Sequence, residues 1–301
     1  MKKIDFMIVG AQKSGTTTIY DFLAKHPNVF VPEVKEIRYF CYDEFHHKGE
    51  RYFDTYFSLA GESRLWGIAY AHQLYFANTA KRVHDYNKNL KLIAALRNPI
   101  ERAYSAYWFA RRNQLEPCDT FEEALGLEQR REDGSFTEKA ELTYLSHGHY
   151  YEQLSAYLGF FDKSQLHVII TDDLKREPAR VYGDLLDFLG LPSATLESSV
   201  DFHSNTSGWP RFAVLHKFLV AGDAWYKKCF RAVICDNLRY RVRRNVLRPL
   251  IRHNIRPFKY PAISKETSAR LQQYYAQHNA KLEELLGRDL SIWSCTSCGG
   301  G

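Results

Sequence analysis

The chain has 301 residues, of which 45% are hydrophobic and 25% charged, a composition typical of a soluble globular protein that can bury a core without disulfides. Its net charge of +6 is unevenly distributed, because residues 227–259 contain eleven lysine or arginine residues and one acid. This distribution excludes a generally basic nucleic-acid binder. For the basic segment three interpretations stay open: a positive rim that attracts anionic ligands, a peripheral contact with an anionic membrane, and a plain solvated surface.

The first element predicted along the chain is a short buried strand over residues 3–9. It starts directly after Met-Lys-Lys, without the apolar core of a secretory signal, and no run approaches the roughly 20 apolar residues of a membrane span. Six cysteines include only one close pair, Cys295 and Cys298, which is a poor zinc signal. We therefore predict a cytoplasmic protein without a metal site, and a disordered tail over residues 295–301.

Strands and helices then alternate along the chain. Further buried strands are predicted over residues 29–31, 90–96 and 165–171, and helices over residues 16–25, 100–112, 148–160, 178–189 and 264–286. Such alternation predicts a parallel sheet with helices on both faces. The predicted fold class is therefore α/β, a P-loop-like parallel sheet flanked by helices. It forms a single domain over residues 1–294, with a mostly helical basic elaboration at about residues 211–259.

The turn after the first strand, within IVGAQKSGTTTIY, has the makings of an anion site. Gly10 and Gly15 have the spacing of a phosphate-binding loop, at a strand-to-helix junction where backbone N–H groups and the helix dipole attract anions. In nucleoside-triphosphate enzymes the lysine follows the second glycine, whereas here Thr16 follows it and the lysine is Lys13. Further hydroxyl groups come from Ser14 and Thr17. A compact anion bound without metal fits this loop better than Mg-ATP.

A second anion site is predicted where the strand over residues 90–96 ends. Arg97 follows the strand directly, and Ser105 lies two turns into the next helix. Strand ends in open α/β sheets face the ligand crevice, so an arginine and a hydroxyl could hold a separate phosphate there. Each residue also has an ordinary structural interpretation, an ion pair for the arginine and a backbone hydrogen bond for the serine.

Together the two motifs resemble those of sulfotransferases that use 3′-phosphoadenosine 5′-phosphosulfate (PAPS). The stretch QKSGTTTIYDFLAKHP resembles the 5′-phosphosulfate loop of that family, and LIAALRNPIERAYSAYW resembles its 3′-phosphate motif. The similarity continues through VPEVKEIRYF, HGHYYEQLSAYLGFF and the C-terminal FKYPAISKETSARLQQYY, and covers most of residues 5–293. The branch with heparan sulfate sulfotransferases and their bacterial relatives is the most similar.

The resemblance implies roles for individual residues. The 5′-phosphosulfate would be held by the loop residues Lys13, Ser14, Gly15, Thr16 and Thr17, and Lys13 would also stabilise charge on the bridging oxygen. The 3′-phosphate would be bound by Arg97 and Ser105, with Arg256 and Lys259 from a late loop over the cofactor. Lys35 would lie near the transferring sulfonate, and Tyr150 would border the adenine. The co-substrate would be PAPS, and the acceptor a small molecule, a glycan or a glycolipid.

One stretch departs from the heparan-type pattern. The family's catalytic glutamate and the proline after it correspond to Ile68 and Ala71, in GIAYAHQLYF. An isoleucine cannot accept a proton, so a hydroxyl acceptor requires another base. His72 is the candidate, because imidazole suits general-base catalysis at neutral pH and cytosolic sulfotransferases use a histidine. The alternatives are His46, His47 and Glu36.

Two other function classes stay open. A P-loop kinase of a small molecule would share the loop, although the position of the lysine argues against it. A non-catalytic nucleotide-binding relative would explain the missing glutamate. The enzyme predicted from all these features is a PAPS-dependent sulfotransferase, which transfers a sulfonate group and releases adenosine 3′,5′-bisphosphate.

Overall fold

The computed structural model describes residues 2–58, 60–61, 64–76, 78–192, 208–212, 250, 253–258 and 260–294. The chain divides into two compact units, each made of separate segments. The first unit comprises residues 1–106, 143–204 and 264–296, and the second comprises residues 107–142, 205–263 and 297–301. Most of the predicted basic elaboration and the predicted tail lie outside the described residues. The extent of a single domain over residues 1–294 stays a prediction.

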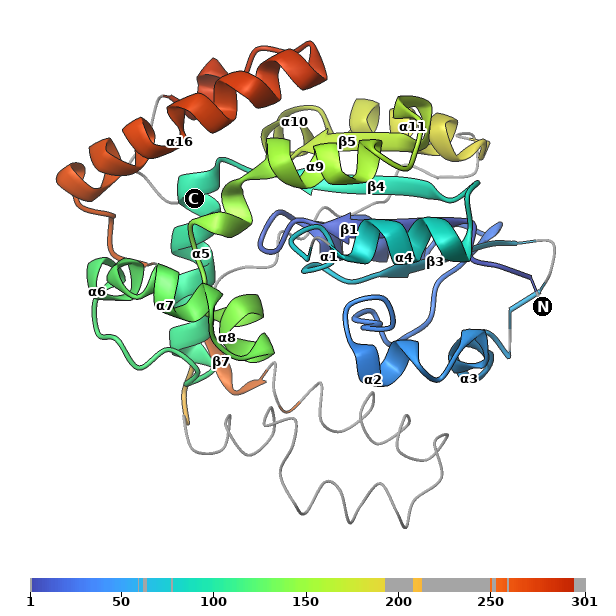
Figure 1. The fold of residues 1–301 in the computed structure, drawn as a ribbon, viewed down its shortest axis with the longest axis horizontal. Coiled ribbons are helices and arrows are strands. Elements are labelled where there is room, and N and C mark those ends of the chain that lie inside the picture. Colours follow the sequence, from blue (N-terminus) through green and yellow to red (C-terminus); the bar gives the residue numbers. More distant parts are fainter. Residues whose placement is uncertain are drawn as a thin grey trace. The chain divides into compact units, whose positions relative to one another are not determined.

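The first unit is built on a five-stranded parallel sheet with the strand order β2-β3-β1-β4-β5 (Figure 1). The strands are β1 (Phe6–Gly10), β2 (Val29–Phe30), β3 (Leu65–Ala69), β4 (Lys91–Leu96) and β5 (Leu166–Ile170). The predicted α/β fold with a parallel sheet is confirmed. The sequence did not predict β3, which lies between β2 and the central strand β1.

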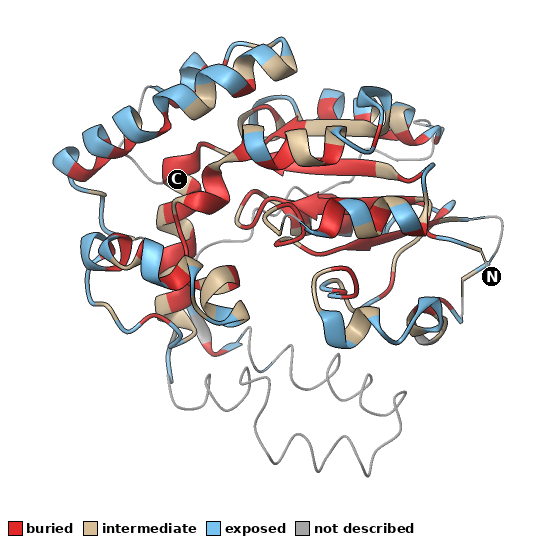
Figure 2. Cartoon of the chain, viewed as in Figure 1, coloured by how far each residue is buried: buried red, intermediate tan, exposed pale blue. Residues whose placement is uncertain are grey.

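Helices cover both faces of this sheet. They are α1 (Thr16–Leu23), α2 (Asp43–His46), α3 (Asp54–Phe57), α4 (Asn78–Tyr86), α9 (Tyr150–Leu158), α10 (Thr171–Arg176), α11 (Pro178–Leu189) and α16 (Lys265–Leu286). Met7 and Val9 of β1 pack on one face with α4, α9 and α16. Phe6 and Ile8 point to the other face and pack with α1 and α11. Because side chains of a strand alternate between faces, both faces are buried, and the helices expose their outer sides (Figure 2).

A glycine in β3 allows this strand to lie against β1. Gly67 pairs with Phe6 in the parallel register, and a Cβ atom at Gly67 would lie 2.0 Å from the Phe6 ring. The phenyl ring therefore occupies the space that a side chain at this position would need. Two of the predicted helix ends are also confirmed: the Ser264 hydroxyl accepts from the Thr267 N–H at 3.0 Å, and Gly287 ends α16 with a φ of 64°.

The second unit is mainly helical in its described part. Its helices are α6 (Phe121–Gly126), α7 (Glu128–Glu132) and α8 (Phe136–Glu141), and β6 (Gly208–Pro210) pairs antiparallel with β7 (Ile255–Pro257). Its core holds a buried ion pair, in which Arg131 donates to both carboxylate oxygens of Glu116 at 2.7 Å. The long helix α5 (Pro99–Arg112) begins in the first unit and ends in the second.

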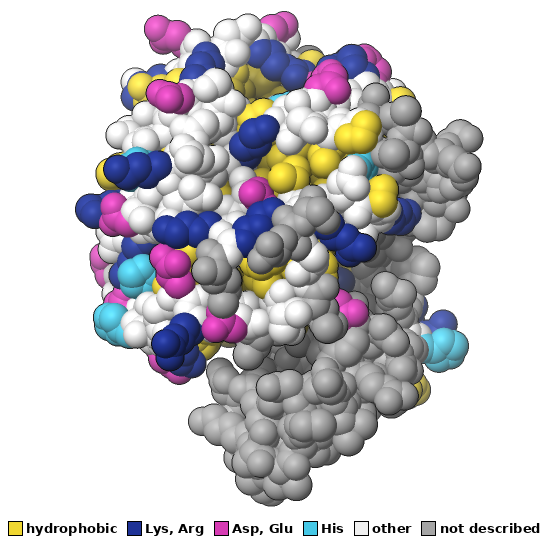
Figure 3. Space-filling view, turned by 90° about the vertical axis from the view of Figure 1, so that its right-hand side faces the viewer, with side chains coloured by type: hydrophobic (Ala, Val, Ile, Leu, Met, Phe, Trp, Pro, Cys, Tyr) yellow, Lys and Arg dark blue, Asp and Glu magenta, His cyan; other side chains and the backbone are white. Residues whose placement is uncertain are grey.

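The charges of the described residues are mixed. The face drawn in Figure 3 carries lysine and arginine side chains interspersed with acidic side chains and apolar areas, so its described part is not a continuous basic surface. Within the described ranges, no helix combines the length and the apolar character that crossing a membrane requires.

Candidate functional site

The two predicted anion sites lie at the carboxyl ends of two neighbouring strands. The loop over residues 10–15 follows β1, and Arg97 follows β4, which pairs with β1. The chain leaves β1 toward β2 and leaves β4 toward β5, on opposite sides of this pair. Ligands of open α/β sheets bind at such a reversal of strand order, outside the carboxyl ends of the strands. The sheet therefore brings the two motifs to one ligand-binding edge.

Backbone conformation shapes the loop after β1. A Cβ atom at Gly10 would lie 2.8 Å from Cβ of Leu74, so only glycine fits there. Gly15, directly before α1, has a φ of 84°, and Lys13 has a φ of 64°, a left-handed value that is uncommon for a residue with a side chain. Such conformations concentrate at binding sites. The first N–H groups of α1 have no acceptor within the helix and can bind an anion.

Lys35 lies against this loop. Its Nζ donates to Oγ1 of Thr16 at 3.0 Å and to Oε1 of Glu36 at 2.8 Å, and its side chain is 15% exposed. The other carboxylate oxygen of Glu36 accepts from the Ala71 N–H at 3.1 Å. The structure therefore joins the lysine predicted near the sulfonate to the loop on one side. Through Glu36, Lys35 is also joined to Ala71, in the stretch that departs from the heparan-type pattern.

Arg97 is paired with a carboxylate on α5. Its Nε and Nη2 donate to Oε2 of Glu101 at 3.0 and 2.7 Å. Ser105 lies one helical turn beyond Glu101 on the same side of α5. The structure thus aligns Arg97 and Ser105 along one side, with Glu101 between them. Sequence reasoning did not single out Glu101, although its four-residue spacing from Arg97 was the available signal.

Tyr150 supports the backbone of Arg97. Its side chain is 1% exposed, and its hydroxyl donates to the Arg97 carbonyl oxygen at 2.9 Å. Burial raises the pKa of this phenol, and the nearby charge of Arg102 opposes that shift. The phenol therefore stays protonated and able to donate at neutral pH. The predicted contact of Tyr150 with adenine stays a prediction.

A buried arginine that the sequence reasoning missed lies beside the loop. Arg102 is fully buried, and its guanidinium donates to the Tyr144 carbonyl oxygen and, at 3.4 Å, to Oε1 of Gln12. Gln12 is itself buried and lies within the loop, directly before Lys13. The available signal was the Glu-Arg pair in the first turn of the predicted helix after Asn98-Pro99.

His72 lies in a buried aromatic cluster just after β3. Its ring is 5.3 Å from the Tyr70 ring and 5.8 Å from the His147 ring, which meets it edge to face. The His147 ring stacks on Tyr75 at 3.8 Å, and both histidines are buried. His72 directly follows Ala71, whose N–H donates to Glu36. Sequence reasoning missed His147, for which the His-Gly-His triplet was the available signal.

The other candidates for the base have different surroundings. His46 ends α2 and packs 5.2 Å from the Tyr39 ring, and burial lowers its pKa. His47 is exposed. Ile68, at the family's glutamate position, is fully buried in the core cluster on one face of the sheet. The position that would carry a glutamate therefore belongs to the apolar core.

Of the two late-loop residues, Arg256 lies in the described part of the chain. Arg256 belongs to the second unit, where it lies exposed in β7 and pairs with Trp209 of β6. Lys259 lies outside the described residues. Their predicted contacts with the 3′-phosphate stay predictions.

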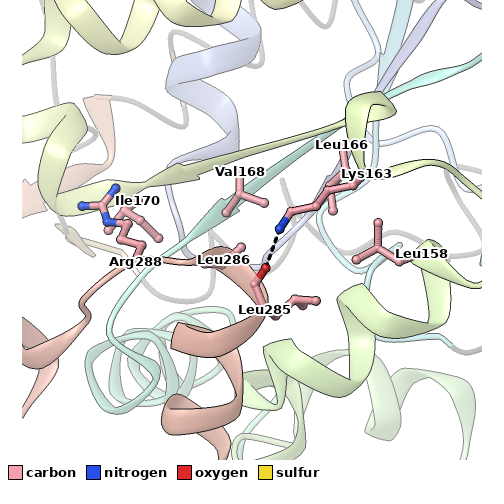
Figure 4. A pocket seen from close by; sticks show the side chains of 8 residues that line it. All are labelled: Leu158, Lys163, Leu166, Val168, Ile170, Leu285, Leu286 and Arg288. Carbon is pink, nitrogen blue, oxygen red and sulfur yellow. Dashed lines mark hydrogen bonds between the residues drawn. The ribbon is translucent and has the colours of Figure 1, made fainter.

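A separate cavity of about 200 Å³ lies along β5 (Figure 4). Its walls are mainly apolar, with a lysine and an arginine among them: Leu158, Lys163, Leu166, Val168, Ile170, Leu285, Leu286 and Arg288. The Lys163 Nζ donates to the Leu285 carbonyl oxygen at 2.8 Å, across the side where α16 ends. The lining contains none of the residues predicted to bind PAPS, so this cavity is distinct from the candidate site.

The candidate site presents cations and backbone donors. Lys13 and Lys35 belong to the loop side, and Arg97 belongs to the side of β4. In the described part of the chain, no group of three or more histidine, cysteine, aspartate or glutamate side chains is arranged to hold a metal ion. Two positively charged centres at adjacent strand ends suit a ligand that carries two separate anionic groups.

Comparison with known sequences and structures agrees with this chemistry. The profile of the sulfotransferase domain matches residues 3–207. The chain is 27% identical over 266 residues to the membrane-associated sulfotransferase kil1 of Dictyostelium discoideum, a match that covers 62% of this chain and 56% of that protein. It is 25% identical over 302 residues to the human bifunctional heparan sulfate N-deacetylase/N-sulfotransferase 3, covering 96% of this chain and 31% of that protein.

A solved structure shares the fold. The sulfotransferase from Alicyclobacillus acidocaldarius is 23% identical and superposes with a TM-score of 0.70, over 98% of this chain and all of that one. The curated relatives are longer, so this chain spans about half of the first and a third of the second.

Proposed function

This chain belongs to the sulfotransferase domain family, and we propose that it transfers the sulfonate group of PAPS to a hydroxyl of a saccharide, glycolipid or small-molecule acceptor. The observation that carries the proposal is the placement of the Lys13 loop and Arg97 at the carboxyl ends of the paired strands β1 and β4. PAPS carries anionic groups at its 5′ and 3′ positions, which match these two centres. The product is adenosine 3′,5′-bisphosphate.

In the proposed mechanism the acceptor oxygen attacks sulfur in line with the leaving phosphate oxygen. The acceptor loses its proton to a base, the new S–O bond forms, and the old S–O bond breaks with its electron pair left on the phosphate. Lys13 and the N–H groups at the start of α1 stabilise this charge. Preorganised donors of this kind typically contribute about 10² to 10³ in rate.

Lys35 is proposed to act beside the sulfonate. Its hydrogen bond to Thr16 supports a position at the start of α1, and its bond to Glu36 supports a link to residues 70–76. A cation there neutralises the sulfonate oxygens as the acceptor approaches. Glu36 orients the lysine in this proposal, since its carboxylate also binds the Ala71 N–H.

His72 is proposed as the base. It lies in the stretch that carries the glutamate in heparan-type enzymes, and the buried cluster around it holds its ring in place. Glu36 stays the nearest rival, because it is bound to the same stretch. A non-catalytic relative stays the second candidate function, and the burial of Ile68 in the core is the observation that favours it.

The acceptor is proposed from the relatives. The human relative is named for sulfation of heparan sulfate, which supports a saccharide among the candidate acceptors, whereas the absent glutamate argues against a heparan-like one. The name of the Dictyostelium relative supports a peripheral membrane contact, for which the basic segment is the candidate. The predicted cytoplasmic location stays a proposal that fractionation of expressing cells would test.

The donor half of the proposal can be tested without an acceptor. Thermal unfolding is followed with adenosine 3′,5′-bisphosphate, with ADP and with Mg-ATP, for the wild type and for Arg97→Ala. The bisphosphate at 100 times its Kd should add ~2.7 kcal/mol without metal. Loss of a charge-assisted bond in Arg97→Ala should weaken its affinity by about 10- to 100-fold.

The control is Arg111→Ala, on the same helix but paired with Asp119 in the second unit, which should leave binding unchanged. Stabilisation by Mg-ATP in place of the bisphosphate would reject the proposal in favour of a kinase. Binding of the bisphosphate without turnover over a broad acceptor panel would support the non-catalytic relative.

A further inference from the structure

A threonine outside both motifs contacts the backbone of both. Oγ1 of Thr171 lies 3.1 Å from the Ser14 carbonyl oxygen and 2.8 Å from the Leu96 carbonyl oxygen, and the two oxygens share its single O–H proton. Thr171 directly follows β5, in which Ile170 pairs with Leu96 of β4. One hydroxyl therefore bridges the 5′-phosphosulfate loop and the residue before Arg97.

The two carbonyl groups belong to peptide units that matter for binding. The Ser14 carbonyl shares a planar peptide with the Gly15 N–H, and the Leu96 carbonyl shares one with the Arg97 N–H. In a trans peptide the N–H points opposite to the C=O. Because the Ser14 carbonyl points toward Thr171, the Gly15 N–H points away from Thr171. Because the Leu96 carbonyl is held as well, the orientation of the peptide that leads into Arg97 is fixed.

Other contacts hold the same parts together through different atoms. The Ala11 N–H donates to the Ala95 carbonyl oxygen at 2.7 Å, which attaches the start of the loop to β4. Tyr150 holds the Arg97 carbonyl oxygen, on the far side of that residue. Thr171 holds the Ser14 carbonyl, in the middle of the loop between Lys13 and Gly15.

We propose that Thr171 is a positioning residue that sets the spacing between the 5′-phosphosulfate loop and the 3′-phosphate arginine. The proposal rests on the proposed function. A ligand with two anionic groups at a fixed separation gains most from a site in which both centres are held at that separation beforehand. A ligand with only the 5′ group gains much less. Thr171 thereby favours adenosine 3′,5′-bisphosphate and PAPS over nucleotides that lack the 3′-phosphate.

The test compares the Kd of adenosine 3′,5′-bisphosphate with that of 5′-AMP, by calorimetry on the full chain. Thr171→Val keeps the shape and removes the hydroxyl, and Thr171→Ser keeps the hydroxyl. Thr171→Val should weaken bisphosphate binding by about five- to tenfold and 5′-AMP binding by less than twofold, and Thr171→Ser should restore the wild-type values. In an Arg97→Ala background, Thr171→Val should lose most of its effect on the bisphosphate.

The control is Tyr86→Phe, which also removes a buried hydroxyl. The Tyr86 hydroxyl accepts from the Ile4 N–H at 2.9 Å, before the amino end of β1 and thus away from the candidate site. It should leave both Kd values unchanged. Unchanged bisphosphate binding in Thr171→Val, or an equal loss for the two nucleotides, would overturn the inference. If the wild type itself does not bind the bisphosphate, the proposed function fails first, so the two failures are distinguishable.

Discussion

The donor side and the acceptor side of the candidate site are built differently. The donor side consists of two short continuous motifs at the ends of β1 and β4. Backbone hydrogen bonds such as that from Ala11 to Ala95 attach it to the sheet, and side chains such as Thr171 hold its backbone carbonyls. The proposed acceptor side combines three separate segments, which bring together Glu36, His72 and His147. An arrangement held by backbone hydrogen bonds persists when neighbouring side chains change, whereas an arrangement held by a side-chain cluster is lost. We therefore expect substitutions to disturb the proposed acceptor side more than the donor side.

Among substitutions that distinguish the two sides, His72→Gln is expected to have the largest effect on kcat. Removing a general base should lower kcat by about 10² to 10⁴. Binding of adenosine 3′,5′-bisphosphate should stay within twofold of the wild type, because the donor side is untouched. The matched control is His253→Gln, at an exposed histidine of the second unit. A large loss in Glu36→Gln with a small loss in His72→Gln would move the role of base to Glu36.

A somewhat smaller effect is expected on the donor side from Lys13→Ala. Loss of the cation at the leaving oxygen should lower kcat by about 10² to 10³, since this charge develops mainly in the transition state. The KM for PAPS should change much less. Lys25→Ala, an exposed lysine after α1, is the control. An increase in KM with an unchanged kcat would show that Lys13 only binds the ground state.

The smallest effect is expected where α9 meets α16, next to Tyr150. The His149 ring stacks on His278 at 4.1 Å and contacts the Tyr274 hydroxyl, and His278 binds Glu152. Burial, and then the charge of His278, lower the pKa of His149 to about 4. The unfolded chain, with an imidazole pKa near 6.5, binds more protons between these values. Stability should therefore fall as the pH drops from 6.5 toward 4.

The expected loss is roughly 1 to 2 kcal/mol, because partial exposure reduces the effect. Urea unfolding at pH 7.5 and pH 4.5 measures it, and His149→Gln should reduce the difference in unfolding free energy between the two pH values by about this amount. The control is His47→Gln, at an exposed histidine, which should keep that difference. An unchanged pH dependence in His149→Gln would place the acid-sensitive group elsewhere.

Much of the fold could be predicted, because local patterns decide it. The apolar run before Gly10, the glycine turn and the run that ends at Arg97 predicted β1 and β4, and Pro178 with Gly190 bounded α11 as predicted. The sequence did not predict β3 because Leu65–Ala69 is short and contains Gly67, and glycine is uncommon inside strands. Only the structure shows that the Phe6 ring occupies the space beside Gly67. The short helices α6, α7 and α8 also lacked a long periodic pattern.

By itself, the sequence determined the α/β class, the loop with Lys13 and the arginine at the end of β4, because these depend on residues close together in the chain. The tertiary structure decided which distant residues meet: Lys35 with Thr16, Glu36 with Ala71, His72 with His147, and Thr171 with both Ser14 and Leu96. The physical reason is that a parallel sheet aligns the carboxyl ends of strands that lie far apart in sequence. No local pattern encodes which loops then share that edge.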